Sequence, residues 1–156
     1  MNTRKVLFCG LGSIGQRHLR NLRALYGDSV EVIAYRGRNA SPVLNPDMTV
    51  RPGAVLETTY NLTSVDRLDD ALALKPDAAF ITNPNSLHLP TALAAAEAGC
   101  HLFIEKPVSH SMAGMADLVR VVEAKRLTTF VAYQFRFHPG LATIKRLIDQ
   151  GRLGQI

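Results

Sequence analysis

The chain has 156 residues, 47% of them hydrophobic, and a formal net charge of +5 at pH 7, which suits one ordinary soluble domain with a real core. Its apolar runs are broken by charges or prolines well before the roughly 20 residues that span a bilayer, and no basic-then-apolar signal segment opens it, so we expect a cytoplasmic protein with no membrane partner. Its basic residues are scattered, with local concentrations only at Arg17 to Arg23 and Arg36 to Arg38, which argues against nucleic acid as a partner.

The N-terminal segment joins a short apolar run to a glycine motif. Lys5 to Cys9 predicts a strand, and it opens directly into Gly10-Leu11-Gly12-Ser13-Ile14-Gly15, which has the G-x-G-x-x-G spacing of a dinucleotide-binding turn. In such a turn the first glycine allows the tight bend, the second lets the backbone approach a pyrophosphate, and the third permits close helix-strand packing. The spacing alone also arises by chance, so the flanking strand and helix carry much of the inference.

The residues that follow predict a helix and a second strand. Residues 13–25 are expected to form an amphipathic helix whose N-terminal amides and dipole would attract a phosphate. Four residues recur at helical spacing on its expected buried face: Ile14, His18, Leu22 and Leu25. Val30 to Tyr35 is a β-branched run, and it predicts a parallel strand that completes a βαβ unit.

The rest of the chain alternates helices and strands. Residues 37–60 contain three prolines and are expected to form an irregular excursion or a small hairpin. After them we predict helices over 65–74, 87–98, 111–124 and 141–150, and strands over 78–82, 101–104 and 128–134. This alternation predicts an α/β fold with a doubly wound parallel sheet.

Four stretches carry a resemblance to a known family. They are Gly10 to Gly15, Thr82-Asn83-Pro84-Asn85-Ser86-Leu87-His88, Ala98 to Pro107, and Tyr133-Gln134-Phe135-Arg136-Phe137-His138-Pro139. In order and spacing they resemble the N-terminal half of the Gfo/Idh/MocA oxidoreductases, named after glucose-fructose oxidoreductase and inositol dehydrogenase. The resemblance implies an NAD(P)-binding Rossmann fold in a dehydrogenase that acts on a sugar, nucleotide sugar or cyclitol by hydride transfer.

The resemblance also divides the chain. Residues 1–138 are expected to be the dinucleotide-binding domain, and residues 139–156 a linking helix and the start of a C-terminal substrate domain that is absent here. Family members commonly take a catalytic histidine from that second domain, and none of the five histidines here matches its position. We therefore expect this chain alone to be inactive, and we leave open a homo-oligomer, because family oligomers usually assemble through the absent domain.

The resemblance places a catalytic group at the turn after the strand over 101–104. Oxidising a secondary alcohol requires hydride loss to a nicotinamide and removal of the hydroxyl proton, so a titratable group must lie beside the reacting carbon. Lys106 is the candidate catalytic residue and a candidate substrate contact. Pro107 makes a cis Lys106-Pro107 bond possible, and Glu105 is expected to orient the turn or the cofactor.

Ligands of an open parallel sheet bind beyond the carboxyl ends of its strands, where the matching motifs would converge. The expected cofactor-binding residues are Gly10, Gly12, Ser13, Ile14, Gly15, Arg36, Arg38, Thr82, Asn83, Pro84, His88, Glu105, Lys106 and Pro107. Arg136 is a further candidate contact of the sugar or polyol substrate. The alternatives are that His88 only opens a helix and that Arg136 forms a surface salt bridge.

The end of the second strand bears on the choice of cofactor. NAD-preferring domains of this kind carry an acidic residue there, which accepts hydrogen bonds from the ribose hydroxyls. Here Arg36 and Arg38 occupy this place, and a guanidinium group offers a 2′-phosphate a bidentate partner. We therefore favour NADP over NAD. The alternative is that Arg36 stacks on adenine while Arg38 faces water, which leaves NAD acceptable.

A second class of function stays open, because a fold alone does not imply an activity. The chain could be a non-catalytic dinucleotide-binding or sensing module. Retention of Glu105-Lys106-Pro107 argues against this alternative, since a sensor would need the backbone of the turn but not the lysine amine. The histidines, cysteines and carboxylates lack the short paired spacings of a zinc site, so no metal is expected.

Overall fold

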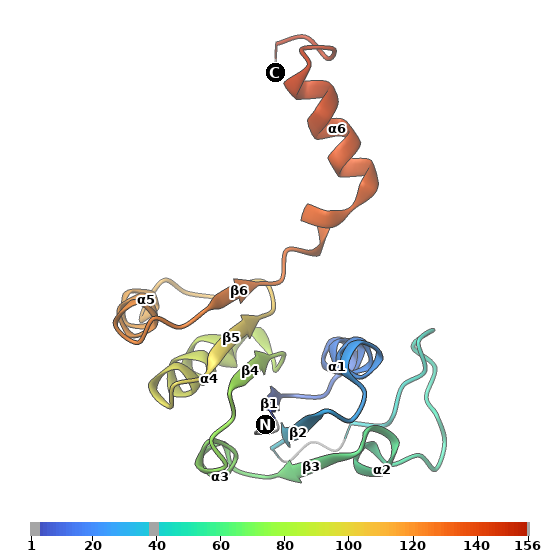
Figure 1. The fold of residues 1–156 in the computed structure, drawn as a ribbon, viewed down its shortest axis with the longest axis vertical. Helices are drawn as coiled ribbons and strands as arrows, with labels where there is room; N and C mark the ends of the chain where they lie inside the picture. Colours follow the sequence, from blue (N-terminus) through green and yellow to red (C-terminus); the bar gives the residue numbers. More distant parts are fainter. Residues whose placement is uncertain (1–3, 38–40, 156) are drawn as a thin grey trace.

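The computed structural model describes residues 4–37 and 41–155, which fold around one six-stranded sheet (Figure 1). The strands are β1 (Arg4–Cys9), β2 (Val30–Tyr35), β3 (Leu62–Val65), β4 (Ala78–Ile81), β5 (His101–Ile104) and β6 (Thr129–Val131). Their order in the sheet is β3-β2-β1-β4-β5-β6, and every neighbouring pair is parallel. This is the strand order of a doubly wound dinucleotide-binding sheet, so the predicted fold class is confirmed.

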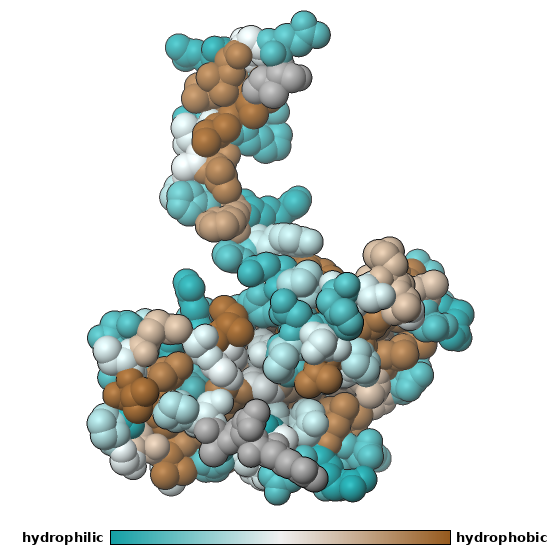
Figure 2. Space-filling model, turned by 180° about the vertical axis from the view of Figure 1, so that it is seen from behind, coloured by the Kyte–Doolittle hydropathy of each residue, from teal (hydrophilic) through white to brown (hydrophobic). Residues whose placement is uncertain are grey.

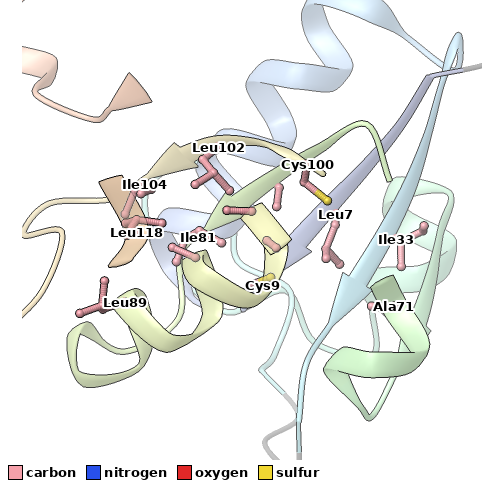
Figure 3. Packing of buried hydrophobic residues seen from close by; sticks show 14 residues of the cluster. Leu7, Cys9, Ile33, Ala71, Ile81, Leu89, Cys100, Leu102, Ile104 and Leu118 are labelled. Carbon is pink, nitrogen blue, oxygen red and sulfur yellow. The ribbon is translucent and has the colours of Figure 1, made fainter. Parts of the chain in front are cut away.

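Helices cover both faces of the sheet. The covering helices are α1 (Ser13–Tyr26), α2 (Leu56–Tyr60), α3 (Leu68–Ala73), α4 (Asn85–Glu97) and α5 (Met115–Ala124), and the chain continues after β6 into the 3-10 helix η1 (Gln134–Phe137) and α6 (Pro139–Asp149). On one face, Leu7 and Ile81 belong to a buried cluster that also contains residues of α3, α4 and α5 (Figure 3). On the other face, Phe8 and Val32 lie in a second cluster with residues of α1 and α2. Alternate residues of β1, β2 and β4 thus serve opposite cores, as expected of a sheet covered on both sides.

The glycine motif brings β1, α1 and β4 into close contact. Gly10 has a φ of +93°, and a Cβ added to Gly15 would lie 2.4 Å from the Gly10 carbonyl oxygen and 2.9 Å from Thr82 Oγ1. The Thr82 hydroxyl donates a 2.6 Å hydrogen bond to that same carbonyl. A Cβ at Gly12, by contrast, would meet no atom of the described residues within 4 Å. The first and third glycines are therefore needed by the fold itself, whereas the space at Gly12 is left free.

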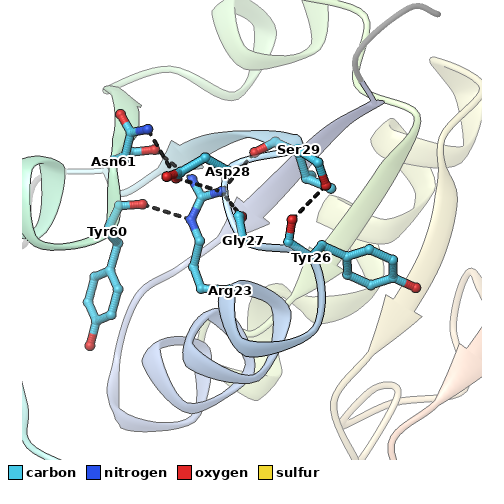
Figure 4. Close-up of polar contacts among 8 residues, drawn as sticks. Arg23, Tyr26, Gly27, Asp28, Ser29, Tyr60 and Asn61 are labelled. Carbon is cyan, nitrogen blue, oxygen red and sulfur yellow. Dashed lines mark hydrogen bonds and ion pairs between the residues drawn. The ribbon is translucent and has the colours of Figure 1, made fainter.

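Two polar side chains, the buried Gln16 and the partly buried Arg23, attach α1 to its surroundings. Gln16 donates to the carbonyl oxygens of Leu11 and Pro42 and accepts from the Leu44 backbone amide, so it holds the excursion after β2 against α1. Arg23 donates to the carbonyl oxygens of Gly27, Val30, Tyr60 and Asn61, as Figure 4 shows in part. These bonds connect the C-terminal end of α1 to the junction between α2 and β3.

Several sequence-based boundaries differ from the structure. Within residues 41–55 the structure has no strand beyond an isolated antiparallel bridge between Leu44 and Val50, and α2 begins at Leu56. The short edge strand β3 was not predicted, and the helix expected over 65–74 is the shorter α3. The helix expected from residue 111 begins at Met115 instead, because Gly114 adopts a φ of +84° and the Ser111 hydroxyl accepts from the Ala113 amide in a local turn.

The prediction of which α1 residues are buried was also partly wrong. Leu25 is 77% exposed, whereas Gly15, Gln16 and Leu19 are the buried residues of this helix. The apolar pattern misplaced the face because the helix approaches the sheet through a glycine and a hydrogen-bonded glutamine. Neither of these residues registers as hydrophobic.

The α6 helix projects away from the sheet and is joined to it through η1 (Figure 1). None of its residues is buried. Leu141, Ile144 and Ile148 are exposed at helical spacing, and Figure 2 shows hydrophobic residues along the projecting helix. We therefore propose that the dinucleotide-binding domain ends at about residue 138, and that α6 belongs to a linking segment.

A chain truncated after residue 138 should keep the thermal stability of the full chain, because α6 buries none of its residues. We expect its midpoint of unfolding, followed by circular dichroism, to stay within about 2 °C. Truncation after residue 127 removes β6 and the buried Ala132, and it should lower the midpoint clearly. A fall of about 5 °C or more in the first variant would place α6 inside the folding unit.

Two glycine substitutions should show which of these glycines the folded backbone requires. Gly15→Ala forces a methyl group into backbone atoms, so we expect it to lower the free energy of unfolding by about 2 kcal/mol or more. Gly12→Ala places its methyl group in open space, and we expect a change within about 0.5 kcal/mol. Urea denaturation of both variants measures the difference. Equal effects would mean that the contact at Gly15 relaxes easily.

Candidate functional site

An open cleft of about 560 Å³ lies where β1, β2 and β4 end. Three segments line it: residues 10–14 of the glycine turn, residues 35–37 together with Ser41 after β2, and residues 82–84 with Leu87 after β4. The chain leaves β1 for one side of the sheet and reaches β4 from the other, so this is the switch point at which open α/β sheets bind ligands. Two of the loops that were predicted to converge, the glycine turn and the loop after β4, meet in this cleft.

The N-terminus of α1 opens onto this cleft. Its first residues, Ser13 and Ile14, line the cleft together with Gly12, which is the N-cap. No side chain of the described residues caps this end, and its first turn holds no acidic residue. The first amides of a helix have no partner within the helix, and together with the helix dipole they favour an anion. The free space at Gly12 leaves room for a phosphate group to approach them.

A second pocket, of about 260 Å³, continues from the cleft. The two share Ile14 and Asn83 in their walls, and the pocket also contains Asn85, His88, Glu105, Lys106 and Gln134. Lys106 is exposed here, whereas Glu105 is only 7% exposed. The turn after β5 and the loop after β4 therefore meet, as the motifs predict, beside the glycine turn.

His88 connects these two loops. It is fully buried, and its Nε2 lies 2.8 Å from the Asn83 carbonyl oxygen while its Nδ1 lies 2.7 Å from the Pro107 carbonyl oxygen. The Lys106-Pro107 bond that follows β5 is cis. Because both ring nitrogens of His88 are engaged, this side chain supports the pocket wall. A contact from His88 to a cofactor stays a prediction.

Asn83 carries a buried acceptor at the junction of cleft and pocket. Its Nδ2 donates to the Thr91 hydroxyl at 2.9 Å, while its buried Oδ1 has no hydrogen-bond partner among the described residues. A buried polar atom without a partner costs free energy, so a ligand donor at this place would be stabilising. An amide group on a bound ligand would meet this requirement.

Glu105 is held from behind by α1. Its Oε1 lies 2.8 Å from His18 Nε2, and its Oε2 accepts a 3.1 Å hydrogen bond from the Lys106 amide. The His18 ring packs edge-on against Phe103, with 4.9 Å between the ring centroids. Glu105 thus orients the turn, one of the two roles expected for it. The sequence showed His18 only as part of a helical pattern, and it gave no sign of this partner 87 positions away.

Arg36 lies at the edge of the cleft and is paired with a carboxylate. Its Nη1 donates to Glu57 Oε1 at 2.7 Å, and the Ser64 hydroxyl donates to the same oxygen. The hydrogen bond from Ser64 is the main cause that lowers the pKa of Glu57, so this carboxyl group is ionised at neutral pH. Sequence analysis missed Glu57. The prediction for Arg38 falls outside the described residues.

Other predicted site residues lie behind or beside the two pockets. Gly15 and Pro107 support the walls through backbone contacts, and Arg136 is exposed in η1, beyond the residues that line either pocket. No group of three or more His, Cys, Asp or Glu gathers within residues 4–37 and 41–155. Burial raises the pKa of Cys100 to about 11 and that of Cys9 still further, so neither thiol is ionised at neutral pH.

In the part of the chain that the structure describes, no helix combines the length and the apolar character needed to cross a membrane.

Comparisons with known proteins agree with this geometry. An inositol 2-dehydrogenase of Gluconacetobacter diazotrophicus is 30% identical over 154 residues, which cover 94% of this chain and 42% of that protein. A D-xylose 1-dehydrogenase (NADP(+)) of Haloarcula marismortui is 31% identical over 100 residues, or 64% of this chain and 28% of that protein. The chain thus spans less than half the length of these curated relatives.

A solved structure and a family description complete the comparison. The WlbA dehydrogenase of Bordetella pertussis, solved in complex with NADH and UDP-GlcNAcA, superposes with a TM-score of 0.76 at 26% identity and covers 99% of this chain and 45% of that one. Residues 4–133 match the family described as "Oxidoreductase family, NAD-binding Rossmann fold". This chain therefore belongs to the Gfo/Idh/MocA oxidoreductase family, and its matched residues form the NAD-binding Rossmann domain of that family.

Proposed function

We propose that this chain is the cofactor-binding part of an oxidoreductase that transfers a hydride between a nicotinamide dinucleotide and a sugar, nucleotide sugar or cyclitol. One observation carries the proposal: the uncapped N-terminus of α1 lies in a cleft that continues into the pocket of Lys106. The relatives support it, since they include an inositol and a xylose dehydrogenase and a structure that holds NADH with a nucleotide sugar.

The described residues fit a dinucleotide along the length of the site. The amides at the start of α1 would hold the pyrophosphate, and the residues around Arg36 and Ser41 would surround the adenosine ribose. The orphaned Oδ1 of Asn83 would accept from the carboxamide of the nicotinamide. The nicotinamide ring, when bound, supplies the hydride acceptor or donor.

Lys106 is the residue we assign to proton transfer. Its backbone amide is fixed by Glu105, so its exposed side chain starts from a defined position at the pocket. A neutral amine would take the proton of a substrate hydroxyl group, and an ammonium group would polarise a carbonyl oxygen in the reverse direction. Arg136 remains a proposed contact for the substrate, because η1 follows directly from the β6 edge of the sheet.

The proposal extends to the cofactor and to the whole protein. We propose that NADP is preferred over NAD, because Arg36 stands where NAD-specific domains carry an acidic residue and only its Nη1 is used by Glu57. The remaining donors would be available to a 2′-phosphate. We also propose a cytoplasmic enzyme that can form a homo-oligomer, and a chain that is inactive without a second, substrate-binding domain.

Side-by-side calorimetric titration with NADPH and NADH tests the cofactor assignment. In low salt without phosphate we expect the chain to bind NADPH more tightly. Arg36→Ala should remove most of this preference, about tenfold, because it deletes the contact to the 2′-phosphate. Gly12→Ala is the matched control, and it should weaken both nucleotides equally because the pyrophosphate is common to them. An unchanged preference in Arg36→Ala would refute the assigned contact.

Substitution of Lys106 separates an enzyme from a sensing module. In a form of the protein that carries a substrate domain, Lys106→Ala should lower kcat by about a hundredfold or more, since proton transfer loses its group. The affinity of the 156-residue chain for NADPH should change less than about threefold, because the cleft keeps its pyrophosphate and ribose contacts. Full activity in Lys106→Ala would remove this residue from the mechanism and favour the sensing alternative.

A further inference from the structure

The guanidinium group of Arg36 does not face the cleft as an isolated charge. Its side chain is 15% exposed and donates through Nη1 to Glu57, whose side chain is 33% exposed and reaches across from α2. Glu57 is in turn fixed by Ser64 on β3. Arg36 lines the cleft, whereas Glu57 and Ser64 stand behind it. Two elements that sequence analysis did not predict therefore converge on one cleft residue.

The pairing leaves Arg36 fully charged but lowers the net positive potential around its guanidinium group. A guanidinium group has five N–H donors, and the contact with Glu57 uses one nitrogen, so donors remain for a second acceptor. The carboxylate, however, cancels much of the positive potential that an approaching anion would meet. A 2′-phosphate is attracted by that potential, whereas the two hydroxyls of an unphosphorylated ribose need only hydrogen-bond partners.

We infer that Glu57 determines how strongly this protein discriminates between nicotinamide dinucleotides with and without a 2′-phosphate, by setting the positive potential around Arg36 at the adenosine end of the cleft. The inference rests on the proposed function, because it assumes that the cleft binds such a nucleotide. Glu57 is not among the residues that line the cleft. It acts through Arg36 as a specificity-determining residue.

The variant Glu57→Gln tests the effect of the negative charge of Glu57 separately from the effect of its hydrogen bonds. Glutamine keeps a carbonyl oxygen that can accept from both Arg36 and Ser64, so the geometry behind the cleft is preserved while the negative charge is lost. We expect the dissociation constant for NADPH to fall about three- to tenfold in low salt, with that for NADH changed less than about twofold. The gain should shrink at about 0.5 M salt, because screening weakens a charge effect more than it weakens packing.

Two further variants separate charge from structure. Ser64→Ala removes the hydrogen bond to Glu57 but keeps the carboxylate, so we expect the ratio of NADPH to NADH affinity to stay within about twofold of the wild-type ratio. In the double variant Arg36→Ala/Glu57→Gln, compared with Arg36→Ala alone, the gain in NADPH affinity should fall below about twofold, because the charge at residue 57 then acts on the phosphate only through space and no longer through a residue that contacts it. Thermal unfolding of each variant confirms that the chain is folded.

The outcomes distinguish this inference from the proposed function. Binding of both nucleotides with an unchanged affinity ratio in Glu57→Gln overturns the inference and leaves the proposed function in place. Weaker NADPH binding in that variant also overturns it, since Glu57 would then act by orienting Arg36. Binding of neither nucleotide by any variant, the wild type included, overturns the proposed function and the inference together.

Discussion

The contact between Gly10, Gly15 and Thr82 fixes the geometry on which the rest of the site depends. Because neither glycine has a Cβ, the first turn of α1 can approach the end of β1 to a distance that no other residue permits. The Thr82 hydroxyl then bonds the carbonyl oxygens of Cys9 and Gly10, so the end of β4 is attached to the same point. β1 and α1, which follow each other in the chain, are thus joined to the distant strand β4. The amides of α1 consequently point into the cleft in one orientation.

The turn that carries Lys106 is attached to α1 and to the loop after β4 by polar side-chain contacts, not by a close approach of backbones. Glu105 joins it to α1 through His18, and His88 joins it to the loop after β4 through the Pro107 carbonyl. Glu105 and His88 are buried, so losing a partner would leave an unsatisfied polar group, at a cost of about 1–3 kcal/mol. The backbone at residue 106 is thus held by two independent attachments. Its side chain stays free to move, which a proton-transferring group requires.

Sequence patterns predicted those structural features that depend mainly on residues close together in the chain. The buried strands, the glycine turn and the alternation of helices with strands follow from residue type and spacing, so five of the six strands and the site loops that follow β1, β4 and β5 were predictable. β3 was not, because its four residues gain strand geometry only from pairing with β2. His18 and Glu57 were missed for a related reason. Periodicity states which face of a helix a residue occupies, but not that its partner is Glu105 or Arg36 from elsewhere in the chain.

The apolar side chains on one face of the sheet become more exposed to solvent toward β6. Phe8, Phe80, Phe103 and Phe130 stack in sequence across four strands, with successive ring centroids 4.6, 4.7 and 5.5 Å apart. Phe8 is fully buried in the cluster that includes residues of α1, whereas Phe130 is 43% exposed. The exposed apolar residues of α6 follow directly in the chain. An isolated helix of this length is marginal in water, so an apolar stripe at helical spacing is a face selected for packing. The elements up to β6 pair within the sheet or pack on it, whereas η1 and α6 bury none of their residues and therefore gain little stability from the dinucleotide-binding core.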